Sequence, residues 1–128
     1  MAELKPMHDR TYEFGLAVIA EYRRAAPADE AEAILWSEVL KTQKSMATNT
    51  AESDGTNTRK DFAAKFQIAL KESRECFQLL RMLAAISPSR RNEVASLLQK
   101  CDEIIAILVK SLKTAKRNDA AEKLKRRQ

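Results

Sequence analysis

The feature that most constrains the fold is a repeat of apolar and small residues between Phe62 and Leu83. The repeat advances in alternating steps of four and three residues, through Phe62, Phe66, Ala69, Ser73, Cys76, Leu80 and Leu83. That spacing is typical of an α-helix that packs one face against another helix. The chain also has only 2 Gly and 3 Pro in 128 residues, too few for a fold rich in hairpins. We therefore expect an all-α protein.

Interruptions in the helical patterning divide the chain into four predicted helices. Pro27, Gly55 and Pro88 interrupt it, and Asp29 and Thr58 stand where a helix N-cap is needed. These positions place the helices at about residues 10–26, 30–53, 59–86 and 89–116. Because the connections between them are short, we expect an antiparallel up-down four-helix bundle that occupies residues 1–116.

A strongly basic segment ends the chain. Residues 110–128 have a net charge of +6, against −1 for all residues before them. Such a density of cations binds phosphate groups by releasing counterions. The predicted nucleic-acid-binding residues are Lys110, Lys113, Lys116, Arg117, Lys123, Lys125, Arg126 and Arg127. The segment after residue 116 either continues as helix or frays. The alternative to nucleic-acid binding is a frayed, solvated tail over residues 117–128 that only keeps the protein soluble.

The third predicted helix has a second apolar flank. Ile68, Leu79, Met82 and Ile86 fall roughly opposite the heptad face on a helical wheel. A helix with two apolar flanks needs two partners, so we expect these four residues to form an interface with another copy of the chain.

The second predicted helix becomes polar along a face that should pack inward. Buried amides and carboxylates need hydrogen-bonded or charged partners. We therefore expect a structural polar layer that fixes the register of the helices, with Lys65 or Arg74 as further partners. Its predicted members are Asn49, Glu52, Arg59, Glu72 and Glu75.

Paired carboxylates of this kind could instead serve acid/base chemistry or bind a metal ion. Metal sites in ferritin-like bundles use Glu-x-x-His motifs, whereas the single histidine, His8, lies outside the predicted helices. We therefore predict no catalytic residue, no metal and no other cofactor.

One stretch closely resembles a known protein family. It reads LKTQKSMATNTAESDGTNTRKDFAAKFQIALKESRECFQLL, from Leu40 to Leu80, and resembles the four-helix bundle proteins encoded in intervening sequences of bacterial 23S rRNA genes. The matching residues are Lys44, Met46, Asn49, Glu52, Arg59, Phe62, Ile68, Ala69 and Glu75. Two positions depart from the family pattern: Ser53 stands where Gly is frequent, and Met46 replaces a β-branched residue.

The resemblance implies a homopentamer whose biochemical role is largely unassigned. A related group acts as accessory proteins in diversity-generating retroelements, which implies RNA and a reverse transcriptase as partners. From these arguments we expect a non-enzymatic RNA-binding scaffold, or alternatively a module that binds a reverse transcriptase.

The longest apolar run, Ile104 to Val109, is too short to span a bilayer, and the N-terminal residues do not resemble a signal peptide. We therefore expect a cytoplasmic protein.

Overall fold

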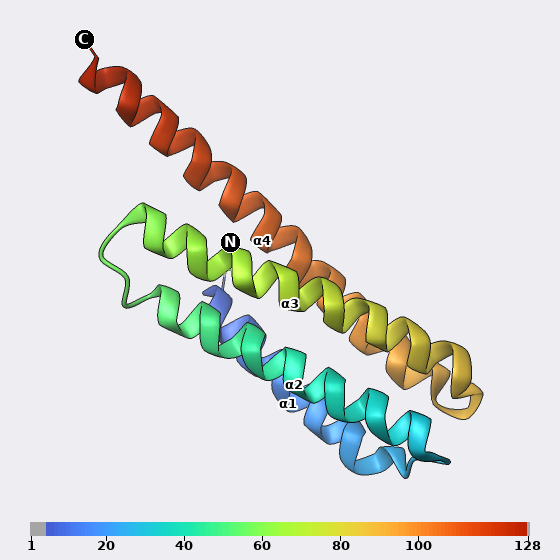
Figure 1. The fold of residues 1–128 in the computed structure, drawn as a ribbon. Coiled ribbons are helices and arrows are strands. Elements are labelled where there is room, and N and C mark those ends of the chain that lie inside the picture. Colours follow the sequence, from blue (N-terminus) through green and yellow to red (C-terminus); the bar gives the residue numbers. More distant parts are fainter. Residues whose placement is uncertain (1–4, 128) are drawn as a thin grey trace.

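The computed structural model describes residues 5–127, which form four α-helices and one short 3-10 turn (Figure 1). The elements are α1 (Met7–Ala25), α2 (Glu30–Ser53), α3 (Arg59–Ile86), η1 (Pro88–Arg90) and α4 (Arg91–Arg126). No strand occurs in this part of the chain, so the expected all-α fold with four helices is confirmed. Residues 1–4 of the predicted domain and residue 128 of the predicted tail lie outside the described residues.

Local capping explains where the two central helices begin. Asp29 Oδ1 accepts a hydrogen bond from the backbone N–H of Glu32 at 2.9 Å, and Thr58 Oγ1 accepts one from Asp61 at 3.0 Å. Each satisfies an amide that has no partner within the first helical turn. At the end of α1, Ala26 has a φ of 40° in the left-handed region, and the chain turns there toward α2.

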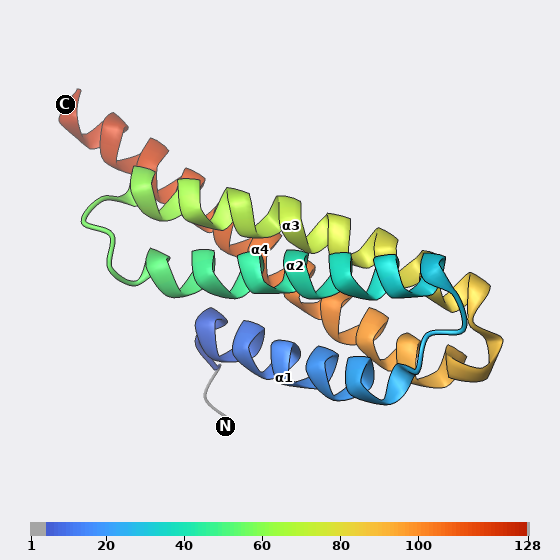
Figure 2. The same ribbon diagram turned by 60° about the horizontal axis from the view of Figure 1, so that its bottom comes forward.

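The four helices form a bundle in which the chain reverses direction at each short connection (Figures 1 and 2). α2 packs along α1 and α3, α3 also packs along α4, and α1 and α4 make a looser contact. The heptad face of α3 points into the core, with Cys76, Leu80 and Leu83 fully buried. Trp36 of α2 is 1% exposed and lies edge-on to Tyr22 of α1, with ring centroids 6.1 Å apart.

The last helix is the longest and continues past residue 116 to Arg126. Its 36 residues extend about 54 Å, whereas the 19 residues of α1 extend about 28 Å. The C-terminal turns of α4 therefore run beyond the start of α1 (Figure 2). An ion pair of 3.0 Å between Glu122 and Arg59 joins this part of α4 to the start of α3. The segment after residue 116 could be helical or frayed, and in the structure it is helical as far as Arg126.

Candidate nucleic-acid interface

The C-terminal part of α4 carries seven of the eight predicted cations on its surface, and the eighth, Arg127, is its C-cap residue. Each of them is exposed. At about 100° per residue, six of the eight fall within an arc of about 140° around the helix axis. We call this set the basic face: Lys110, Lys113, Lys116, Arg117, Lys123 and Arg127. The other two positions in the arc are Ala120 and Leu124, so no acidic residue interrupts it.

Most of these cations have no acidic partner. Among the described residues, Lys123 alone of the eight forms an ion pair, at 3.5 Å from Asp119. The nearby carboxylate of Glu122 is engaged by Arg59 on α3. A row of exposed, uncompensated cations along one side of a helix produces a positive field that attracts polyanions. The basic face is therefore a surface suited to a polyanion.

The structure does not bring the five residues of the predicted polar layer together. Glu52, Arg59 and Glu75 are exposed, while Asn49 and Glu72 are half-buried. The Asn49 amide donates to the Ser45 carbonyl oxygen of its own helix at 2.9 Å. The expected pairing of Glu52 with Lys65 is present, at 2.7 Å, and it links α2 to α3 at the surface.

The physical reason is the direction of the inward stripe on α2. This stripe continues through Met46, Thr50 and Ser53, which are all buried. Asn49 and Glu52 each lie one position before a stripe residue, and one residue rotates a side chain by about 100° around the helix. They consequently lie on the flank of α2, where long polar side chains reach solvent.

A different set of polar residues is buried between α1 and α2. The hydroxyl oxygens of Thr11 and Thr50 are 2.7 Å apart, and the Gln43 side-chain amide donates to the Thr11 carbonyl oxygen at 3.2 Å. This arrangement needs a glycine at position 15. A Cβ atom there would lie only 2.8 Å from Cδ of Gln43, which is too close unless the Gln43 side chain moves. Thr11 and Gly15 were not among the predicted polar residues. A signal existed, since Gln43 and Thr50 share the inward stripe of α2 and needed polar partners.

Three of the four predicted interface residues are exposed in the single chain. Ile68, Met82 and Ile86 of α3 are 42%, 53% and 46% exposed. Leu79 is half-buried and packs against the core. Single exposed apolar residues are common on proteins, but three on one helix face make a stripe that a partner could cover.

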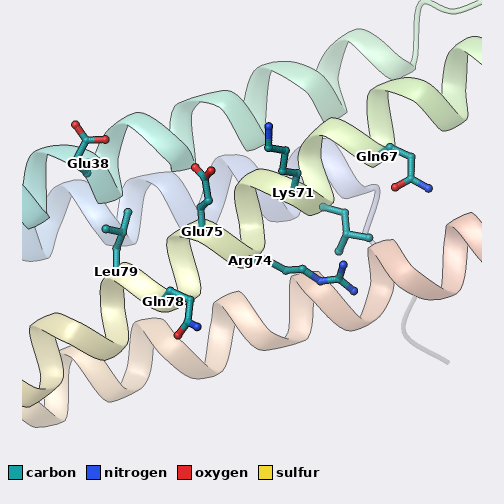
Figure 3. Close-up of a pocket in the computed structure, with 8 residues that line it drawn as sticks. Glu38, Gln67, Lys71, Arg74, Glu75, Gln78 and Leu79 are labelled. Carbon is teal, nitrogen blue, oxygen red and sulfur yellow. The ribbon is translucent and has the colours of Figure 1, made fainter.

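A groove of about 590 Å³ lies beside this stripe on α3 (Figure 3). Its lining includes Glu38 of α2 and, on α3, Lys71, Arg74, Glu75 and Leu79. In Figure 3, Lys71 and Glu75 point toward the α2 side and Arg74 points toward the α4 side. The two acidic and two basic side chains balance, so the groove attracts neither cations nor anions strongly.

The remaining polar groups include side chains of the types that can bind a metal ion. Within residues 5–127, no group of three or more His, Cys, Asp or Glu side chains is placed to hold a metal ion. His8 Nδ1 lies 2.5 Å from Asp54 Oδ2, which ties the start of α1 to the end of α2. No helix in this part of the chain has the length and apolar character needed to cross a membrane.

Comparison with known proteins agrees with the fold. A sequence model described as "23S rRNA-intervening sequence protein" matches residues 7–110, from the start of α1 to the first cation of the basic face. A similar solved structure is that of a protein of unknown function from the S23 ribosomal protein family, from Bacteroides thetaiotaomicron VPI-5482. It has a TM-score of 0.74 and 25% identity, over 84% of this chain and 98% of that chain. No curated protein matches the chain.

The family match covers most of the chain, and it includes the stretch from Leu40 to Leu80 on which the resemblance was based. The resemblance is thereby confirmed. The chain belongs to the 23S rRNA-intervening sequence protein family.

Proposed function

We propose that this protein is a non-enzymatic, homo-oligomeric scaffold of antiparallel four-helix bundles that binds RNA in the cytoplasm through the basic face of α4. The observation that carries the proposal is the row of six exposed cations, five of them without an ion-pair partner among the described residues. Each phosphate that such a row neutralises releases a counterion, which makes binding favourable and dependent on salt.

Assembly would strengthen this interaction. The exposed stripe of Ile68, Met82 and Ile86 supports contact between copies, and the family resemblance favours a pentamer. Five copies at +5 each carry a total charge of +25. Several basic faces on one particle bind a long polyanion more tightly than one face does, because each later contact is intramolecular.

The binding test is fluorescence anisotropy with a labelled structured RNA between about 50 and 200 mM salt. We expect affinity to fall steeply as salt rises. Lys113→Glu/Arg117→Glu should weaken binding at least tenfold, because it reverses two cations of the basic face. The matched control, Lys41→Glu/Lys44→Glu, makes the same change in net charge on exposed positions of α2 and should weaken binding far less. Equal losses in both variants, or binding that ignores salt, would contradict the proposal.

The assembly test is the mass of the particle by sedimentation or light scattering. We expect about five times the 14.5 kDa of one chain, and a smaller particle for Ile68→Glu/Met82→Glu. The matched control, Ile34→Glu, changes another exposed apolar residue, which lies on α2 and is 54% exposed. A monomeric wild-type protein would remove assembly from the proposal.

A protein partner is the second candidate function. The charge-balanced groove beside Leu79 suits a protein surface better than a polyanion, which favours a module that docks on a partner such as a reverse transcriptase. Co-purification with the reverse transcriptase of a neighbouring gene tests this candidate. A complex that survives high salt and is lost in Leu79→Glu would favour protein docking over RNA bridging.

A further inference from the structure

A second groove opens at the end of the bundle where α1 begins, α2 ends and α3 begins. It has a volume of about 660 Å³ and is lined by all four helices, and we call it the end groove. It exists because α1 is short. Arg10 and Phe14 of α1 still lie opposite Ile104 of α4, whereas Ser111, Thr114 and Asn118 lie beyond the first turn of α1 and line open space.

The floor of the end groove is apolar and partly aromatic. Phe62 and Phe66 of α3 lie side by side, with ring centroids 4.3 Å apart and ring planes inclined by 34°. Phe66 is 5% exposed, whereas Phe62 is only half-buried and therefore offers more of its ring to a ligand. Pro6, Met7, Ile107 and Ala115 complete this apolar lining. An aromatic surface of this kind binds the flat face of a nucleobase by stacking.

Polar groups stand among these apolar ones. Three side chains of α4 line the groove with hydroxyl or amide groups, namely Ser111, Thr114 and Asn118. A hydroxyl or a carboxamide can donate and accept hydrogen bonds, as the edges of a nucleobase require. An acyl chain would leave these groups without partners, so the lining favours a nucleobase over a lipid tail.

The rim of the end groove is positive. Lys5, Arg10, Arg59 and Lys110 line it, against the single carboxylate of Asp54. Lys5 pairs with Glu13 and Arg59 pairs with Glu122, while Arg10 and Lys110 have no ion-pair partner among the described residues. Lys110 also belongs to the basic face. On a helical wheel, Lys110 lies at the edge of the basic face, between the other cations and the groove-lining Ser111, Thr114 and Asn118. An RNA bound to the basic face therefore meets the groove at Lys110.

We propose that the end groove holds one unpaired nucleotide of the bound RNA, with its base against Phe62 and Ile107 and its phosphate between Arg10 and Lys110. The volume lies within the range of about 300–1,000 Å³ that is usual for small-ligand sites. This inference rests on the proposed function and adds to it. The basic face attracts any RNA, whereas the end groove selects RNA in which a base is free to leave its stack.

The experiment compares two labelled RNAs of equal length, a continuous duplex and the same duplex with one bulged adenosine replaced by 2-aminopurine. Full-length protein should bind the bulged RNA several times more tightly than the duplex. Moving the base out of its stack in the RNA should also raise the 2-aminopurine fluorescence. Phe62→Leu keeps an apolar side chain but removes the ring, so it should abolish both the preference and the rise in fluorescence while duplex affinity stays unchanged.

Two further variants control for damage to the fold. Phe77→Leu makes the same substitution at a half-buried position of α3 that does not line the groove, and it should keep the preference. Thr114→Leu fills the groove from an exposed position on α4 and should abolish the preference even if Phe62→Leu does not fold. Equal wild-type affinity for the two RNAs, or a rise in 2-aminopurine fluorescence that persists in Thr114→Leu, would overturn this inference alone. Absence of salt-dependent binding to either RNA would overturn the proposed function as well.

Discussion

The hydroxyl oxygens of Thr11 and Thr50 lie 2.7 Å apart in the interior of the bundle and join α1 to α2. The two residues are 0% and 1% exposed. Each hydroxyl also lies within hydrogen-bond distance of a carbonyl of its own helix, at Met7 and Met46, both 3.1 Å. One hydroxyl therefore donates across the interface while the other donates within its helix. Because the contact joins two specific positions, it fixes the register of α1 along α2.

Thr50→Val should lower the free energy of unfolding by about 1–2 kcal/mol, since it deletes a buried hydrogen bond while keeping the shape of the side chain. The double variant Thr11→Val/Thr50→Val should cost less than the sum of the two single variants, because no hydroxyl is then left without its partner. Urea unfolding followed by circular dichroism measures each value. Thr48→Val, on an exposed position of α2, is the control and should change stability very little. Simple additivity would show that the two hydroxyls are not coupled.

Gly15→Ala should destabilise the protein, although alanine is the better helix former by about 1 kcal/mol. A Cβ at this position meets the Gln43 side chain, and moving that side chain breaks its buried hydrogen bond to Thr11. In a Gln43→Ala background the obstruction is absent, so Gly15→Ala should become stabilising. Chemical unfolding of the four proteins in this cycle gives the coupling energy. The same effect of Gly15→Ala in both backgrounds would contradict the explanation.

Ser87→Ala should lower the free energy of unfolding by about 1.5–3 kcal/mol, because hydrogen bonds to charged groups are the stronger ones. The buried Ser87 hydroxyl donates to Glu32 Oε1 at 2.5 Å, and the other oxygen of that carboxylate accepts from the Ala28 N–H at 2.8 Å. Glu32 thus ties the link between α1 and α2 to the turn after α3. Thermal unfolding measures the effect. Ser89→Ala, on an exposed position two residues away, should leave the melting temperature unchanged.

Cys76 and Cys101 should be unreactive in the folded protein. Both thiols are free and fully buried, and the Cys101 thiol donates to the Ser73 carbonyl oxygen at 3.3 Å. A hydrogen bond with Cys76 raises the pKa of Cys101, and burial raises it further. Cys101 therefore stays protonated at neutral pH and is a poor nucleophile. The same hydrogen bond lowers the pKa of Cys76, so Cys76 is protected by its complete burial, which excludes the reagent. Ellman's reagent should therefore label both cysteines only as fast as the protein unfolds. Rapid labelling in native buffer would show that the contact between α3 and α4 opens locally.

Several features of this protein were predictable because their causes are local. Caps at Asp29 and Thr58 each involve residues three positions apart, so the starts of α2 and α3 can be inferred from a few letters. The buried face of α3 follows from its periodicity. The row of cations on α4 is equally visible, although composition left open whether the segment is helical. The contact between Arg59 and Glu122, 63 residues apart, favours the helical form.

The polar interior was harder to predict. A helical wheel shows that Asn49 and Thr50 are neighbours, but a shift of one residue decides which of them is buried. That choice depends on where Thr11 of α1 lies, and Thr11 is 39 residues from Thr50. The end groove was not predictable either, because it arises from the difference in length between α1 and α4 and from the way the helix ends meet.

The sequence by itself determined four helices, the bounds of the two central ones, the inward face of α3 and the family, since periodicity, caps and motifs depend on residues near one another in the chain. Only the tertiary structure decided which polar side chains are buried and where the surface is hollow. Those properties depend on contacts between residues that are distant in the chain, and helix packing alone brings such residues together.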